Sequence, residues 1–306
     1  MNELVEKINE LKKQKKAVIL AHCYQNAEID EVADFVGDSL YLSQKANETD
    51  AEIIVFAGVY FMAQTAKLLS PDKKVLLPRL ESGCRMADMI DLEQVREFKS
   101  KHPNIPVICY INSTAEVKSE CDMCCTSSNA VKIVKTMQEK DGVDEVLFLP
   151  DTYLGKWVEQ QLGNVKIITY PGFCPTHLQI KPKDILEARK KYPDAKVLAH
   201  PECHQEVTKL ADYVGSTTGI MKYAIESDEK QFIIATEKGV VDRLKRDYPE
   251  KEFILIKESI ICPNMKWHTL QDIYNALEKE QHEITVDEEI AKKAVTCINR
   301  MLEISK

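Results

Sequence analysis

Three cysteines recur at nearly the same interval along this 306-residue chain. Cys174 follows Cys84 by 90 residues, and Cys262 follows Cys174 by 88. Brought together, three thiolates form a metal site with an incomplete ligand shell. A structural zinc ion normally takes four protein ligands, whereas an iron–sulfur cluster held by three cysteines leaves one iron open. The spacing therefore indicates a metal centre whose open position acts as a Lewis acid on a substrate.

The other cysteines fit a simpler interpretation. Cys121 and Cys124 have the C-x-x-C spacing of redox-active or zinc-binding pairs, but no second pair follows and neither residue recurs at the interval. We interpret both as structural. The single thiols that we expect to serve in packing are Cys23, Cys109, Cys203 and Cys297.

Two kinds of polar landmark share the interval. Apolar runs end in His22, Asn112 and His200, at intervals of 90 and 88 residues. Hydroxyl clusters contain Ser39, Ser127 and Ser216, at intervals of 88 and 89 residues. Hydroxyls that precede helices can bind an anionic substrate together with the helix N-terminus, or can simply cap the helix. Their recurrence at one period favours binding.

The elements that must position these residues follow a regular order. Amphipathic stretches, such as Ile29–Ala46, alternate with apolar runs rich in β-branched residues, which predicts parallel sheets flanked by helices. The predicted strands are Ala17–Ala21, Ile53–Ala57, Lys74–Leu77, Val107–Ile111, Glu145–Leu149, Val165–Thr169, Lys196–Ala199, Phe232–Ala235 and Glu252–Ile256. Helices near 2–14, 91–101 and 182–191 would open three units, and two more would follow Thr269.

The period predicts the domain organisation. We expect three similar parallel-sheet α/β domains in a pseudo-threefold arrangement around a central metal centre: 1–87, 88–178, and 179–306 including the C-terminal helices. Functional residues of open parallel sheets gather beyond the carboxyl ends of the strands. Three such edges facing one axis would bring the three cysteines into one cavity.

Composition narrows the function classes. The net charge of −8 gives little support to nucleic-acid binding. Residues 1–16 are charged and lack the apolar stretch of a signal peptide, and the longest apolar run, Ile53–Ala63, is far short of the roughly 20 residues of a membrane span. We therefore expect a cytoplasmic protein that binds neither nucleic acid nor membrane.

Many short segments, in order from about residue 15 to residue 270, resemble the quinolinate synthase family. They are Ala21-His22-Cys23-Tyr24-Gln25, Gly37-Asp38-Ser39-Leu40, Tyr110-Ile111-Asn112-Ser113-Thr114, Cys125-Thr126-Ser127-Ser128-Asn129-Ala130, Cys174-Pro175-Thr176-His177, His200-Pro201-Glu202-Cys203, Asp212-Tyr213-Val214-Gly215-Ser216-Thr217 and Asn264-Met265-Lys266.

The resemblance implies a transferase with one 4Fe–4S cluster per chain, held by Cys84, Cys174 and Cys262. It implies condensation of iminosuccinate (iminoaspartate) with dihydroxyacetone phosphate to quinolinate, phosphate and water, in pyridine nucleotide synthesis. A transient contact with an aspartate-oxidising enzyme would supply the iminosuccinate. The residues that would line the substrate pocket are His22, Ser39, Tyr110, Ile111, Asn112, Ser127, His200, Pro201, Glu202 and Thr217. Of these, Ile111 and Pro201 offer only backbone or packing.

Proton transfer next to a carbonyl or imine calls for a carboxylate and a phenol or imidazole. We assign Glu202 as general base or acid, Tyr24 and His177 as proton donors or relays, and Tyr110 beside them. Some members of the family carry a C-terminal C-x-x-C-x-x-C, but here the tail has only Cys297, so redox control through that motif is not expected.

Two other functions stay open at this stage. One is a non-catalytic binding protein stabilised by zinc. The other is an aconitase-like hydro-lyase that uses the open iron on a hydroxy acid. Metal analysis would distinguish the zinc-stabilised protein from an iron–sulfur enzyme. An assay for quinolinate would distinguish the hydro-lyase from a quinolinate synthase.

Overall fold

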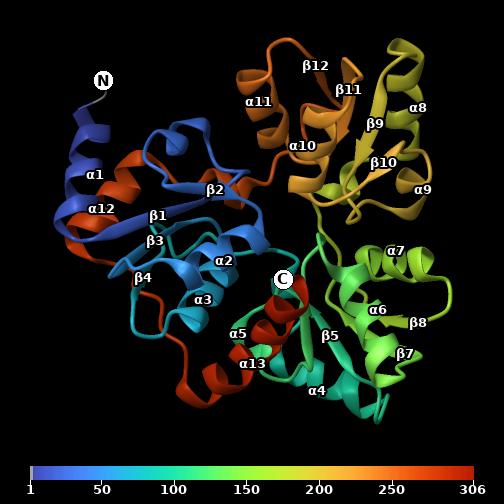
Figure 1. Ribbon diagram of the computed structural model, residues 1–306, viewed down its shortest axis with the longest axis horizontal. Helices are drawn as coiled ribbons and strands as arrows, with labels where there is room; N and C mark the ends of the chain where they lie inside the picture. The colour runs from blue at the N-terminus through green and yellow to red at the C-terminus, as the bar shows by residue number, and fades with distance from the viewer. Residues whose placement is uncertain (1–2) are drawn as a thin grey trace.

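The computed structural model describes residues 3–306. It contains three four-stranded sheets, each in its own lobe around a common centre (Figure 1). All strand pairs within the sheets are parallel. The predicted class, three similar parallel-sheet α/β domains, is confirmed, whereas the boundaries at residues 87 and 178 stay a prediction.

The three sheets repeat one strand order. The first, β2-β1-β3-β4, comprises β1 (Ala17–His22), β2 (Phe35–Gly37), β3 (Ile53–Ala57) and β4 (Lys74–Leu76). The second, β6-β5-β7-β8, comprises β5 (Val107–Tyr110), β6 (Met123–Cys125), β7 (Glu145–Leu149) and β8 (Lys166–Thr169). The third, β10-β9-β11-β12, comprises β9 (Lys196–Ala199), β10 (Tyr213–Val214), β11 (Gln231–Ala235) and β12 (Glu252–Leu255).

Helices flank each sheet. In the first lobe they are α1 (Glu3–Gln14), η1 (Ala27–Glu31), α2 (Ser39–Glu48) and α3 (Tyr60–Leu69). In the second they are η2 (Ala87–Met89), α4 (Leu92–Ser100), α5 (Ala115–Lys118), α6 (Ala130–Asp141) and α7 (Thr152–Leu162). In the third they are η3 (His177–Gln179), α8 (Pro182–Lys191), α9 (Gln205–Thr208), α10 (Thr217–Glu226), α11 (Lys238–Asp247) and η4 (Pro263–Lys266).

The nine predicted strands are present, and each sheet has one more, namely β2, β6 and β10. These are edge strands of two or three residues. The stretch Ile29–Ala46 is consequently not one helix, because β2 separates η1 from α2. So short a strand contributes too few residues to change the apolar pattern of the sequence.

One aspartate fixes each edge strand to its sheet. Asp34 accepts the backbone N–H of Ile19 at 2.8 Å, Asp122 accepts that of Val107 at 2.8 Å, and Asp212 accepts that of Val197 at 2.7 Å. In all three pairs the residues are 15 apart. The carboxylate satisfies a backbone donor of the neighbouring strand, which pins the register where the edge strand begins. The recurrence supports the threefold repeat independently of the cysteines.

The last two helices return to the first two lobes. Helix α12 (Leu270–Lys279) packs against α1 and β3, and α13 (Glu288–Ser305) packs against β6, α5 and α6. Leu270, Ile273 and Leu277 are buried in the same core as Val5 and Ile8. The C-terminal segment thus completes the cores of lobes formed much earlier in the chain.

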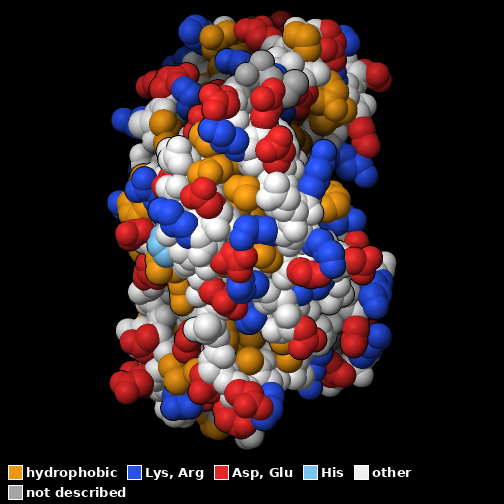
Figure 2. All heavy atoms as spheres, turned by 90° about the vertical axis from the view of Figure 1, so that its left-hand side faces the viewer, with side chains coloured by type: hydrophobic (Ala, Val, Ile, Leu, Met, Phe, Trp, Pro, Cys, Tyr) orange, Lys and Arg blue, Asp and Glu red, His pale blue; other side chains and the backbone are white. Residues whose placement is uncertain are grey.

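The outer surface mixes both charge signs. On the face formed by the first lobe, basic and acidic side chains are interspersed (Figure 2). Lys15 and Lys74 both pair with Glu280, and Lys7 pairs with Glu3. Among residues 3–306, no helix has both the length and the apolar character needed to cross a bilayer.

Candidate active site

A cavity of about 300 Å³ lies where the three lobes meet. It is lined by residues that follow the carboxyl ends of strands in every lobe. The predicted site residues that line it are His22, Tyr24, Ser39, Cys84, Tyr110, Asn112, Ser127, Cys174, His177, His200, Glu202, Thr217 and Cys262. The threefold arrangement therefore brings together side chains that are up to 240 positions apart, from His22 to Cys262.

Two predicted pocket residues do not line this cavity. Ile111 is 1% exposed and belongs to the apolar core, and its backbone N–H donates to the carbonyl of Cys125 at 2.8 Å. Pro201 is buried between His200 and Glu202. Their assignment to the substrate pocket, through backbone or packing, stays a prediction.

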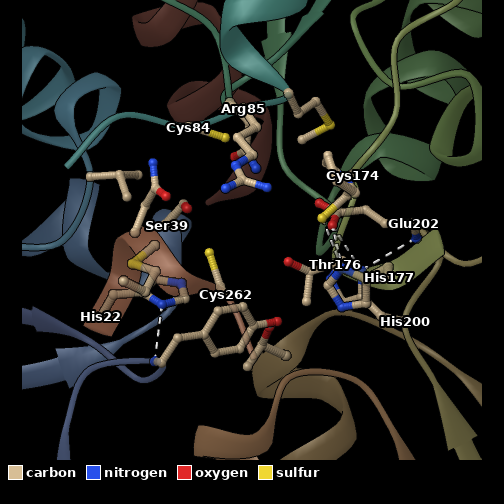
Figure 3. Close-up of a pocket in the computed structure, with 18 of the residues that line it drawn as sticks. His22, Ser39, Cys84, Arg85, Cys174, Thr176, His177, His200, Glu202 and Cys262 are labelled. Atoms are coloured by element: carbon tan, nitrogen blue, oxygen red, sulfur yellow. Dashed lines mark hydrogen bonds and ion pairs between the residues drawn. The ribbon is translucent and has the colours of Figure 1, made fainter. Parts of the chain in front are cut away.

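Cys84, Cys174 and Cys262 point into the same space from three sides (Figure 3). They follow β4, β8 and β12, the last strand of each sheet. All three are partly exposed to the cavity. Burial raises the pKa of Cys84 to about 12 and raises the pKa of Cys174 and of Cys262 as well, and the neighbouring thiols add to the shift at Cys84 and Cys174. Thiols with raised pKa values lose their protons when they bind a cationic metal centre, because the metal compensates the negative charge of the thiolates.

The distances between these sulfurs bear on whether they could hold a single zinc ion or a larger cluster. Among residues 3–306, one set of three His, Cys, Asp or Glu side chains has all its ligand atoms within 4.8 Å of one another. That set is Cys174, His177 and Glu202, and it does not include the other two cysteines. Sulfurs around one zinc ion would lie roughly 4 Å apart, given a Zn–S bond of about 2.3 Å. The three cysteine sulfurs do not all lie within 4.8 Å of one another, so the donor set suits a larger sulfide-bridged cluster better than a single zinc ion.

Glu202 makes two short polar contacts in the cavity wall, and the His177 nitrogen of the second contact also lies 3.2 Å from the Cys174 sulfur. The Tyr110 hydroxyl donates to Oε1 at 2.6 Å, and Nδ1 of His177 lies 2.7 Å from Oε2. Burial acts to raise the pKa of Glu202, but His200, His177 and the hydrogen bonds from His177 and Tyr110 outweigh it and lower the pKa. The carboxylate form is therefore the one that these donors stabilise.

A chain of hydrogen bonds continues from Glu202 to the opposite wall. Nε2 of His177 lies 2.8 Å from the Thr236 hydroxyl, which lies 3.1 Å from the Tyr24 hydroxyl. The Tyr24 hydroxyl in turn lies 2.9 Å from that of Thr217. The Thr236 hydroxyl can donate and accept, so it links the His177 ring to the Tyr24 hydroxyl. The arrangement is a continuous line of hydrogen-bonding groups from His177 to Thr217.

Two other histidines are kept neutral by burial. Burial lowers the pKa of His22 to about 4 and the pKa of His200 to about 3, although Asp38 and Glu202 respectively act in the opposite direction. The ring of His200 stacks on that of His177, with centroids 4.6 Å apart. Neutral imidazoles can donate hydrogen bonds to a substrate without adding charge.

Two helix N-termini and one arginine reach the cavity, and groups of these kinds favour anions. Ser39 begins α2 and Thr217 begins α10, and both line the cavity. Arg85 is the only lysine or arginine among the described residues that line it, and its guanidinium has no hydrogen bond or ion pair with them. Figure 3 shows Arg85 extending into the space between the cysteines. An unpaired cation at this place can pair with a substrate phosphate or carboxylate.

Sequence reasoning missed Arg85 in the cavity lining and three further residues near the site, Thr236, Glu237 and Asp151. Thr236 links His177 to Tyr24, as described above. Glu237 accepts the backbone N–H groups of Gly239 at 2.6 Å and Cys262 at 3.2 Å, and so holds the loop that carries Cys262. Asp151 is fully buried, caps α7, and has one carboxylate oxygen without a hydrogen-bond partner among the described residues.

No other cysteine among residues 3–306 lines the cavity. Neither Cys121 nor Cys124 lines it. Cys124 is fully buried, and its sulfur lies 3.0 Å from that of Cys297 in α13. Both contribute to packing between the second sheet and the C-terminal helix.

Comparison with known proteins gives one consistent result. The sequence profile of the family described as Quinolinate synthetase A protein matches residues 6–303. The chain is 52% identical over 306 residues to the quinolinate synthase of Alkaliphilus metalliredigens, covering 99% of this chain and 100% of the relative. It is 48% identical over 304 residues to that of Thermodesulfovibrio yellowstonii, covering 99% of each, and 47% identical over 310 residues to that of Aquifex aeolicus, covering 100% and 95%. The chain therefore belongs to the quinolinate synthetase A family.

Proposed function

We propose that the chain is a quinolinate synthase of NAD biosynthesis, which condenses iminosuccinate with dihydroxyacetone phosphate. The observation that carries this function is the convergence of one cysteine from each lobe on a cavity that also holds the Glu202–His177 pair. The products, quinolinate, phosphate and two waters, balance the atoms of the substrates without oxidation or reduction. The site therefore needs acid–base catalysis and a Lewis acid, and no electron acceptor.

The proposed cofactor is one 4Fe–4S cluster held by Cys84, Cys174 and Cys262. When bound, it supplies a Lewis acid beside the substrate. Glu237 would position the Cys262 loop through the backbone of that residue. Ordering of ligands by such outer contacts is general in metal sites.

The side chains divide the remaining tasks. Glu202 removes a proton from carbon next to the imine or carbonyl, while Tyr110 and His177 stabilise its carboxylate. The path through Thr236 delivers protons to and from the hydroxyl of Tyr24, a residue that lines the cavity. Protons are thus available on both sides of the substrate without bulk water.

Binding of two anionic substrates requires donors. Ser39, Ser127 and Thr217 offer hydroxyls from three lobes, two of them at helix N-termini that favour anions. We assign the phosphate of dihydroxyacetone phosphate to Arg85. Asn112 and His200 add neutral donors for the iminosuccinate carboxylates.

The test is anaerobic purification followed by metal analysis and an assay. We expect about four iron and four sulfide per chain, a brown protein, and quinolinate formed from the two substrates. One zinc per chain would instead support the binding-protein alternative. Iron without quinolinate formation, but with dehydration of a hydroxy acid, would support the hydro-lyase. An aspartate-oxidising enzyme in the assay would supply the labile iminosuccinate.

A further inference from the structure

One carboxylate, that of Asp38, contacts all three lobes. Its Oδ1 accepts the backbone N–H of Tyr41 in the first lobe at 3.1 Å. Its Oδ2 accepts the hydroxyl of Ser128 from the second lobe at 3.1 Å and that of Thr218 from the third lobe at 2.6 Å. Asp38 is 8% exposed and lines the cavity. A single oxygen atom therefore ties the other two lobes to the first.

This contact arises where the threefold repeat is broken. Counting from the strand-pinning aspartates Asp34, Asp122 and Asp212, the fourth residue on is Asp38 in the first lobe, but Thr126 and Ser216 in the others. The sixth residue on is Leu40 in the first lobe, but Ser128 and Thr218 in the others. At the fourth position the first lobe thus has a carboxylate acceptor, where the other two lobes have hydroxyls. At the sixth position the other two lobes have hydroxyl donors, where the first lobe has a leucine. The asymmetry is complementary.

The residues between these positions are the proposed substrate hydroxyls. Ser39 follows Asp38, Ser127 precedes Ser128, and Thr217 precedes Thr218. The backbone neighbours of each substrate hydroxyl are consequently held by the contact to Asp38. Separation of any lobe by a few ångströms would break a hydrogen bond to Oδ2 and move one of these hydroxyls away from the others.

The charge of Asp38 argues against direct substrate binding. Both proposed substrates are anionic, so a carboxylate in the cavity wall opposes their binding by charge repulsion. No lysine or arginine among residues 3–306 forms an ion pair with Asp38. Hydrogen bonds are therefore the interactions that compensate this carboxylate for its removal from water. The loss of any one donor should consequently be costly.

We propose that Asp38 is a positioning residue that latches the three lobes together, so that Ser39, Ser127 and Thr217 face one substrate. This rests on the proposed function for the identity of the substrate, but the latch itself is a property of the free protein. Removal of the latch separates the three hydroxyls in the free protein, and substrate binding must then close the lobes again. Loss of the latch should therefore raise KM more than it lowers kcat.

The variants Asp38→Asn, Ser128→Ala and Thr218→Val test the latch from each lobe. Asparagine is an efficient N-cap and keeps the acceptor for Tyr41, so α2 should stay intact. A hydrogen bond to a charged group is worth a factor of roughly 10 to 100, so each variant should raise KM for both substrates by about that factor, with a smaller change in kcat. The iron content and visible spectrum should not change. The matched control is Thr136→Val, which removes an exposed hydroxyl bonded within α6.

Two measurements separate the possible results. Hydrogen exchange of residues 126–129 and 216–219, without substrate, should quicken in the latch variants and not in the control. The double variant Asp38→Asn with Thr218→Val should raise KM no more than Asp38→Asn alone, because Thr218→Val removes one of the two hydrogen bonds to Oδ2 that Asp38→Asn already removes. Unchanged exchange and KM in Ser128→Ala and Thr218→Val would overturn the latch, as would a loss of kcat alone in Asp38→Asn. If the wild type makes no quinolinate while exchange still quickens, the proposed function fails and the latch does not.

Discussion

The Nδ1 atom of His177 lies 2.7 Å from Oε2 of Glu202, and both side chains are buried. The same ring reaches Thr236 with its other nitrogen and stacks on His200. Its orientation is thus fixed from three sides. The acid–base assignments of the site depend on this orientation, and they lead to the following predictions.

Glu202→Gln should remove most turnover and keep the metal centre. The amide cannot accept a proton from carbon, and general acid–base catalysis contributes a factor of about 10² to 10⁴. We expect kcat to fall by at least about 100-fold on that basis, with an unchanged visible spectrum. Glu206→Gln, an exposed glutamate in the same segment, is the control. A Glu202 variant with the wild-type rate would refute the role.

Thr236→Val should interrupt the proton path with little change in shape. The variant removes the hydroxyl between His177 and Tyr24. Loss of one hydrogen bond in the path should lower kcat by roughly tenfold and alter its pH profile, with KM nearly constant. Thr296→Val, at an exposed hydroxyl of α13, should leave the profile unchanged. An unaltered profile in Thr236→Val would place the proton path elsewhere.

Replacement of Cys84, Cys174 or Cys262 by Ala should abolish bound iron and activity together. Each variant leaves only two of the three proposed ligands. Cys121→Ala and Cys124→Ala should keep both, because neither residue lines the cavity. Iron per chain and the visible spectrum are the measurements. Iron lost from the second pair, and retained in the first three, would reverse the ligand assignment.

Arg85→Ala should weaken binding of the phosphate substrate selectively. A charge-assisted hydrogen bond is worth about 1.5–3 kcal/mol, so KM for dihydroxyacetone phosphate should rise roughly 10- to 100-fold. Arg85→Lys should recover part of the loss, since lysine keeps the charge without the fork of the guanidinium. Arg96→Ala, which removes a surface pair with Glu120, is the control. Equal effects on both substrates would contradict the assignment.

Stability should fall as the pH drops from about 6.5 toward 4, in part through His22. The folded pKa of this histidine is lowered to about 4 from 6.5, mainly by burial, so in this window the unfolded chain binds the extra proton. The free energy of unfolding should lose about 1.4 kcal/mol per pH unit there for each such histidine. His22→Gln should reduce that slope, whatever it does to stability at neutral pH. Denaturant unfolding at several pH values is the measurement, and an unchanged slope would contradict it.

The period of the sequence predicted the three lobes and the meeting of three distant cysteines. It could do so because the landmarks follow long apolar strands, whose signal is strong. The edge strands β2, β6 and β10 were missed because two or three residues carry no periodicity. Their pinning aspartates, Asp34, Asp122 and Asp212, do recur at the same interval and would have marked them.

Thr236 and Asp151 were missed for a different reason. Thr236 follows β11 directly, and Asp151 comes two residues after β7, where functional residues of parallel sheets gather. The same argument that selected His200 applied to them, but neither belongs to a set that recurs in all three lobes. The contact between Asp38 and Thr218 could not be predicted, because it depends on how the lobes are placed relative to one another.

The return of α12 and α13 to the first two lobes has a consequence for biosynthesis. A multidomain chain generally folds from its N-terminus while it emerges from the ribosome. Here the apolar surfaces of the first sheet beneath α12, and of the second sheet beneath α13, stay uncovered until residues 270–305 have been translated. Nascent chains of this protein should therefore be strong clients for ribosome-associated chaperones, even after two of the three sheets have left the exit tunnel.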